Sequence, residues 1–164
     1  LCMGFLRMMG ETMEPPPEFH KEQAMDPSRI FIPFVGTMLL TMLVWIYMYA
    51  RRLPFLASSG MLKQRQITPE ELARRSPAAV AMPSDNLKNL FEMPTIFYAV
   101  VLCLAITQRV DDQYIVAAWA FFALRVAHSL VHCTFNYIPL RFLVYVASAA
   151  ALWFMVIRLA LQLL

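Results

Sequence analysis

Ionisable side chains are concentrated in residues 125–145, RVAHSLVHCTFNYIPLRFLVY, which are otherwise apolar enough to lie in lipid. Arg125, His128 and His132 follow one another at steps of three and four residues, so an α-helix would align them on one face. An ionisable group inside a membrane segment costs about 2.5 to 3.5 kcal/mol, and such groups persist where something pairs with them or uses them. This stretch is therefore the first candidate for a functional site.

A second polar stripe follows on the next segment, where Arg141, Tyr145 and Ser148 are also separated by three or four residues. Pro139 precedes this stripe where a helix would restart, because its fixed φ angle suits a first turn and its missing N–H is not needed there. The pattern predicts two adjacent helices whose polar stripes lie near the same end.

The chain is far more apolar than a soluble domain, with 60% hydrophobic and 15% charged residues. A membrane helix needs about 20 apolar residues, so 164 residues leave room for about four crossings and their loops. The net charge of +3 is too small to indicate nucleic-acid binding. The three cysteines do not make a disulfide framework, since Cys103 and Cys133 lie in apolar segments. We predict an all-α, multi-pass integral membrane protein in contact with the lipid bilayer.

The chain divides into an acidic, proline-rich arm, residues 1–29, and a four-helix transmembrane bundle, residues 30–164. The run PPP in the arm favours polyproline II and blocks a helix. Ser84 and Asp85 are the expected cap of the second span. The predicted membrane spans are residues 30–49, 87–107, 114–135 and 142–161.

The loop between the first two spans, residues 51–85, contains a dense group of basic side chains. These are Arg51, Arg52, Lys63, Arg65, Arg74 and Arg75. By the positive-inside rule this loop faces the cytoplasm or its equivalent, and four crossings place both chain ends on the other side. The sequence does not distinguish a bacterial inner membrane, the endoplasmic reticulum and the mitochondrial inner membrane. Thr68 and Glu71 form a capping box that predicts a short surface helix before Ser76.

Three pairs of polar residues are predicted to share one membrane face. They are Asn89-x-x-Glu92, Arg125-x-x-His128 and Arg141-x-x-x-Tyr145. Their order and spacing in a four-crossing chain resemble the MAPEG family of membrane-associated proteins in eicosanoid and glutathione metabolism. The chain is most similar to the prostaglandin E synthase branch, where RVAH also occurs, and to small bacterial members. The resemblance covers about residues 30–164.

The resemblance implies a homotrimer with glutathione bound between neighbouring subunits, and lipophilic small molecules as the second substrate. The residues that it assigns to glutathione are Asn89, Glu92, Arg125, His128 and His132, with Arg51 or Arg52 from a neighbour. Arg141 would face the thiol, with Tyr145 one turn later as its catalytic partner. Arginine binds carboxylates such as those of glutathione in a bidentate way, and a guanidinium beside the thiol favours the nucleophilic thiolate.

The sequence departs from the prostaglandin branch at three positions. His132 stands where the synthases have a tyrosine, Phe142 replaces a serine beside the catalytic arginine, and Asp85 lies near the position of an arginine. These changes argue against the isomerase chemistry of that branch. They leave glutathione transfer and peroxide reduction as the expected reactions.

Other interpretations of the polar residues remain open at this stage. A buried ion pair between the second and third spans would also account for Glu92 and Arg125. His128 and His132 have the spacing of metal ligands but lack a clear third ligand, so we predict no metal site. Arg141 would also suit a lipid phosphate at the membrane interface.

We predict a membrane glutathione-dependent transferase or peroxidase whose lipophilic substrates enter from the bilayer. The alternative is a non-catalytic accessory subunit that keeps the fold and is held in a larger membrane complex by residues 1–29. A third hypothesis is a lipid-binding regulatory protein, which would keep the intersubunit cleft without needing Arg141. An enzyme needs that cleft open, whereas an accessory subunit does not.

Overall fold

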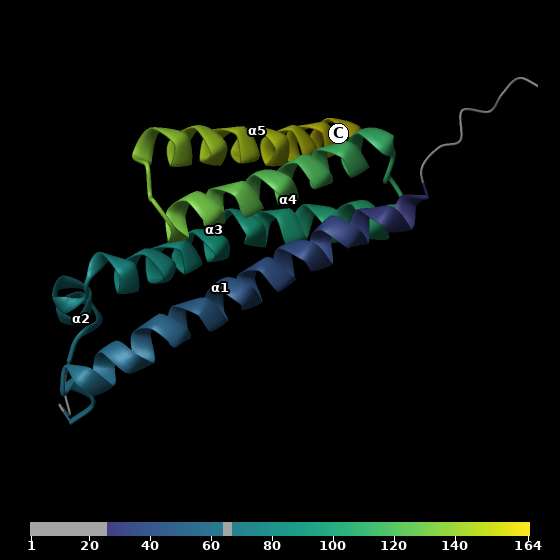
Figure 1. Ribbon diagram of the computed structural model, residues 1–164. Helices are drawn as coiled ribbons and strands as arrows, with labels where there is room; N and C mark the ends of the chain where they lie inside the picture. The colour runs from purple at the N-terminus through teal and green to yellow at the C-terminus, as the bar shows by residue number, and fades with distance from the viewer. Residues whose placement is uncertain (1–25, 64–66) are drawn as a thin grey trace, which may run out of the picture.

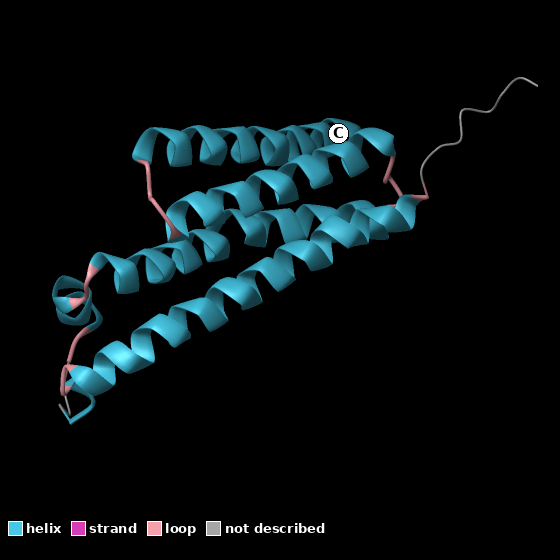
Figure 2. Ribbon diagram, in the orientation of Figure 1, coloured by secondary structure: helices cyan, strands magenta, loops and turns pink. Residues whose placement is uncertain are grey.

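The computed structural model describes residues 26–63 and 67–164 (Figure 1). In these residues every regular element is helical (Figure 2), and two short 3₁₀ segments, Pro27–Ile30 and Met61–Lys63, accompany the α-helices. The α-helices are α1 (Phe31–Ser58), α2 (Pro69–Arg75), α3 (Ala78–Ile106), α4 (Asp112–Cys133) and α5 (Ile138–Leu163). The predicted all-α class is confirmed. Most of the predicted arm, residues 1–25, lies outside the described residues.

In the described part of the chain, α1, α3, α4 and α5 are long and apolar enough to cross a membrane. Helices of 22 to 29 residues are about 33 to 44 Å long, which exceeds a hydrocarbon core of about 30 Å. The start of α1 and the C-terminus lie at one end of the bundle, and α2 and the α4–α5 turn lie at the other (Figure 1). This arrangement agrees with a four-crossing membrane bundle.

The helices pack most closely at the end away from α2. Phe97 of α3 stacks on Phe121 of α4, with ring centroids 4.4 Å apart. The other fully buried apolar side chains of this core are Ile30, Val101, Leu104, Tyr114, Ala118, Leu152 and Met155. Inside a membrane such contacts stabilise the fold through van der Waals packing. Toward α2 the bundle is looser, because α1 diverges from α5 (Figure 1).

Two helix ends differ most from the predicted spans, and the others lie within four residues of them. α1 does not end at residue 49, where the predicted span ends, but continues to Ser58. α3 begins at Ala78, so the predicted cap is wrong, and Ser84 and Asp85 lie inside the helix. Charged residues mark where a helix leaves the hydrocarbon, but the helix satisfies its own backbone hydrogen bonds and can continue into water. Both helices therefore extend beyond the bilayer at the end that carries α2.

Two predicted helix starts are confirmed. The Thr68 hydroxyl accepts a hydrogen bond from the Glu71 backbone N–H at 3.2 Å, which caps α2. Glu71 also pairs with Arg75 one turn later. Pro139 lies in the first turn of α5, where its missing N–H has no consequence.

The turn between α3 and α4 is joined to the last turns of α5 by Asp111. Its Oδ1 accepts the Tyr114 backbone N–H at 3.1 Å and so caps α4. Both carboxylate oxygens also accept hydrogen bonds from Arg158, at 2.7 and 2.6 Å. The Arg158 guanidinium lies 4.4 Å from the centroid of the Tyr114 ring. Arg158 therefore ties α5 to the start of α4.

Asp111→Ala should lower the free energy of unfolding by about 1 to 2 kcal/mol, because the substitution removes a helix cap and the partner of Arg158. Asp111→Asn keeps a capping side chain and should cost less than about 1 kcal/mol. The hydrogen bonds from Arg158 lower the pKa of the Asp111 carboxyl. The pair's contribution is therefore present above the unfolded pKa of about 3.9 and is lost as pH falls through the lower folded value.

Chemical unfolding of the detergent-solubilised protein, repeated from neutral to acidic pH, measures both effects. An equal loss in the two variants would show that the cap contributes nothing.

Candidate functional site

Helical spacing brings the predicted polar residues of α4 and α5 together. Arg125, His128 and His132 lie on one face of α4, and the His128 and His132 rings meet edge to face at 5.6 Å. The ring of Tyr145 from α5 lies 5.8 Å from that of His128 and 4.9 Å from the Arg125 guanidinium carbon. We call Arg125, His128, His132, Arg141 and Tyr145 the α4–α5 cluster.

Arg125 is the most unusual member of the cluster. Its side chain is fully buried between the rings of Phe121 and Tyr145. None of its three guanidinium nitrogens has an acceptor at normal hydrogen-bond geometry among the described residues, although the Tyr145 side chain and the Glu92 carboxylate lie near enough to interact with its charge. A buried charge without a partner costs several kcal/mol of folding free energy. If Arg125 were already paired, substituting it would instead leave its partner charge buried and unpaired, which is strongly destabilising. No carboxylate of the described subunit is in direct contact with the guanidinium, so an anionic group from a ligand or a neighbouring subunit would stabilise the charge.

Besides the Arg125 nitrogens, His128 also has one buried ring nitrogen without a partner. Its Nδ1 lies 3.2 Å from the backbone carbonyl oxygen of Arg141, and a carbonyl only accepts, so Nδ1 donates. Nε2 is then a bare acceptor, and it too has no partner in the described part of the chain. The contact fixes the ring against the first turn of α5. It leaves Nε2 free to accept a hydrogen bond from a ligand.

Arg141 is held at the start of α5 by a residue that the sequence analysis missed. Its Nη1 donates to Oδ1 of Asn136 at 2.6 Å. Asn136 adopts a φ angle of +47°, and its backbone N–H donates to the Val131 carbonyl at 2.8 Å. Asparagine tolerates this left-handed conformation better than most residues. The sequence feature that could have identified Asn136 is an asparagine in the turn before Pro139.

Of the two expected site residues on α3, one contacts the α4–α5 cluster and the other does not. The Asn89 amide donates to Nδ1 of His132 at 3.5 Å, so Asn89 connects α3 with the α4–α5 cluster. Glu92 is exposed, and the described residues contain no ion pair between it and Arg125. The ion-pair explanation of these two residues is therefore not supported within one subunit.

A further buried amide on α3 was not recognised in the sequence. Asn86 has no exposed surface, its amide nitrogen lies 3.4 Å from the Cys133 sulfur, and its oxygen accepts from the Ser129 hydroxyl at 3.5 Å. Its position three residues before Asn89, on the same helical face, was the signal. Among the described residues, no three His, Cys, Asp or Glu side chains are grouped to hold a metal.

The two arginines of α1 lie apart from the cluster. Arg51 is exposed, whereas Arg52 is partly buried and lines a hollow with Asp85 and Lys88 of α3. Their expected contact with glutathione depends on a neighbouring subunit. It remains a prediction.

Comparison with known proteins gives one match. Residues 30–161 match the model of the MAPEG family. No curated protein and no solved structure matches the chain. The match includes all four long helices and the whole α4–α5 cluster.

Arg125→Met tests whether the guanidinium is unpaired in the absence of a ligand. Methionine fills similar space without a charge, so the thermal stability of the ligand-free protein should be unchanged or higher. Arg125→Ala should lower it by about 2 kcal/mol or more, because it leaves a cavity. Differential scanning calorimetry of both variants in detergent measures the change in thermal stability. A loss of about 3 kcal/mol or more in Arg125→Met would show that a carboxylate already pairs with Arg125 in the assembled protein.

Proposed function

Because the chain belongs to the MAPEG family, we propose that it is an integral membrane glutathione-dependent transferase or peroxidase that acts on lipophilic substrates. The observation that carries this proposal is the buried, unpartnered guanidinium of Arg125 beside the unpartnered Nε2 of His128. Both groups lie on α4, which is a membrane span where water is not available to satisfy them. An anionic, hydrogen-bonding ligand would satisfy both.

Glutathione has the chemical groups that this cluster lacks. Its two carboxylates suit arginine, and its amine suits the exposed carboxylate of Glu92. The ring of Tyr145 covers Arg125 in the present conformation, so a carboxylate reaches the guanidinium only if this ring turns aside. Asn89, His128 and His132 supply further polar contacts along α3 and α4.

Arg141 is the proposed catalytic residue, with Tyr145 as its partner. Arg141 is only partly buried at the start of α5, and Asn136 orients its guanidinium. A permanently charged guanidinium favours the thiolate form of a neighbouring thiol. Phe142, the next residue, is 67% exposed and projects about 100° further round α5, so it adds to the apolar surface near the start of that helix.

Two reactions are open to such a thiolate. In transfer, the sulfur bonds to an electrophilic carbon, and the displaced electron pair takes up a proton or leaves with the leaving group. In peroxide reduction, the sulfur takes the outer oxygen of a hydroperoxide, whose remaining alkoxide is protonated to an alcohol. The thiol of a second glutathione then attacks the resulting sulfenic acid, which forms glutathione disulfide and releases water.

A homotrimer would complete the site. We propose that Arg51 or Arg52 from α1 of a neighbouring subunit contacts glutathione, because neither arginine belongs to the α4–α5 cluster of its own subunit. The loop 51–85 then faces the cytoplasm or its equivalent, in accordance with its basic residues. An accessory subunit would instead satisfy Arg125 with a carboxylate from another protein.

Arg141→Ala should weaken glutathione binding about tenfold or more, because a hydrogen bond to a charged group is lost. It should also remove the thiolate absorbance of bound glutathione, since the guanidinium no longer favours the charged sulfur. Calorimetry and ultraviolet difference spectra of the detergent-solubilised protein measure the two effects. Arg74→Ala, on exposed α2, is the matched control and should behave as wild type. Unchanged binding and an unchanged thiolate signal in Arg141→Ala would contradict the assignment.

Asn136 can be tested with a pair of substitutions that separate its backbone role from its side-chain role. Asn136→Gly adopts the positive φ angle freely but no longer accepts a hydrogen bond from Arg141. Asn136→Asp keeps an acceptor. We expect the glycine variant to fold and to lose most of the thiolate signal. The aspartate variant should keep the contact with Arg141 but only part of the signal, because its negative charge disfavours a nearby thiolate. A full signal in Asn136→Gly would show that Arg141 does not depend on this contact.

A further inference from the structure

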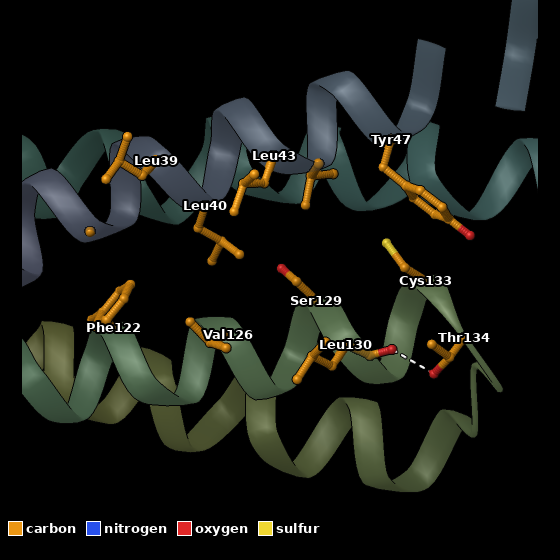
Figure 3. A pocket seen from close by; sticks show the side chains of 12 residues that line it. Leu39, Leu40, Leu43, Tyr47, Phe122, Val126, Ser129, Leu130, Cys133 and Thr134 are labelled. Atoms are coloured by element: carbon orange, nitrogen blue, oxygen red, sulfur yellow. Dashed lines mark hydrogen bonds between the residues drawn. The ribbon is translucent and has the colours of Figure 1, made fainter. Parts of the chain in front are cut away.

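A groove separates α1 from α4 in the looser half of the bundle (Figure 3). Its volume is about 590 Å³, within the range of about 300 to 1,000 Å³ found for small-molecule sites. Leu39, Leu40 and Leu43 of α1 face Val126 and Leu130 of α4 across the gap (Figure 3). The walls are therefore apolar along most of their length.

The groove is open to the surroundings of the bundle. Leu43 and Leu130 are 59% and 61% exposed, and both lie in helices that are candidate membrane spans. In a single subunit the groove therefore opens toward the lipid hydrocarbon. At its closed end α1 and α4 approach closely, since a Cβ atom on Gly36 would lie 2.9 Å from the ring of Phe122.

The polar side chains of the groove are gathered toward the α2 end, and most already have partners. The Thr134 hydroxyl donates to the Leu130 carbonyl at 2.6 Å. Ser129 and Cys133 both contact the buried amide of Asn86. These wall groups do not need a polar ligand inside the groove. An apolar chain therefore fits beside these three side chains without breaking their hydrogen bonds, and the Tyr47 hydroxyl lies at the α2 end of the groove.

A cationic side chain follows where the groove reaches the membrane face. Arg51 lies one turn beyond Tyr47 on α1, so it continues the face that lines the groove. About 30 Å of helix separates Arg51 from Phe31, which matches the thickness of the hydrocarbon core. Arg51 is exposed at that level, where lipid headgroups lie. Arg52 instead lines a hollow with Asp85 and Lys88, so we assign the lipid phosphate to Arg51 and the proposed contact with a neighbour's glutathione to Arg52.

We propose that the α1–α4 groove binds one acyl chain of an anionic phospholipid of the surrounding bilayer, with the lipid phosphate against Arg51. The apolar walls, the opening to hydrocarbon and the cation at headgroup level all match this one ligand. The groove is formed by α1 and α4, whereas glutathione is proposed to bind at the α4–α5 cluster. The proposal therefore does not depend on the proposed enzymatic function.

Native mass spectrometry of the delipidated protein, without glutathione and with added phosphatidylglycerol or phosphatidylcholine of the same chains, tests the proposal. The wild-type protein should retain phosphatidylglycerol preferentially. Leu40→Trp fills the groove and should lose this retention, whereas Leu161→Trp, on the exposed end of α5, should retain the lipid as wild type does. Arg51→Gln should reduce the preference for the anionic headgroup about fivefold while still retaining a chain.

Cys133 provides a second readout that does not depend on a bulky substitution. In a protein with Cys2→Ser and Cys103→Ser, added phosphatidylglycerol should slow alkylation of Cys133 by an apolar maleimide, because the thiol lines the groove. Equal alkylation with and without lipid, together with equal lipid retention in wild type and Leu40→Trp, would overturn the proposal. So would a loss of oligomer mass in Leu40→Trp, since the groove would then hold a second copy of the chain.

Discussion

The main physical constraint on this structure is a positive charge, the Arg125 guanidinium, that lies inside a membrane bundle without a hydrogen-bond acceptor. Lipid cannot hydrogen-bond the Arg125 guanidinium, and the described residues of one subunit do not do so either. The charge is retained at a cost of several kcal/mol unless something else compensates for it. A bound anion or a neighbouring subunit is the physical solution, and membership of a glutathione-related family makes the first of these the better explanation.

The two halves of the bundle separate the tightly packed core from the proposed ligand site. Away from α2, the helices share a continuous core, and Asp111 joins the start of α4 to Arg158 of α5. Toward α2, α1 diverges, which opens the groove beside α4, while the polar residues of α4 and α5 face one another. A rigid base of this kind can hold Arg141 and Tyr145 in place while the more open end admits ligands.

Local spacing predicted the cluster better than it predicted the partners within it. The steps of three and four residues correctly aligned Arg125, His128 and His132, because the helical repeat alone determines that alignment. The buried ion pair between Glu92 and Arg125 is absent from the described subunit, since Glu92 lies on the exposed face of α3. The contact of Asn136 with Arg141 was missed, because it depends on how the turn between α4 and α5 is folded.

The sequence by itself determined that this is a helical membrane protein with four crossings, because hydrophobic length and helical periodicity are properties of each segment alone. Only the tertiary structure decided that α1 and α3 extend beyond the hydrocarbon, that Arg125 lacks an acceptor and that a groove separates α1 from α4. The last two of these features depend on distances between segments far apart in the chain. No single segment carries that information.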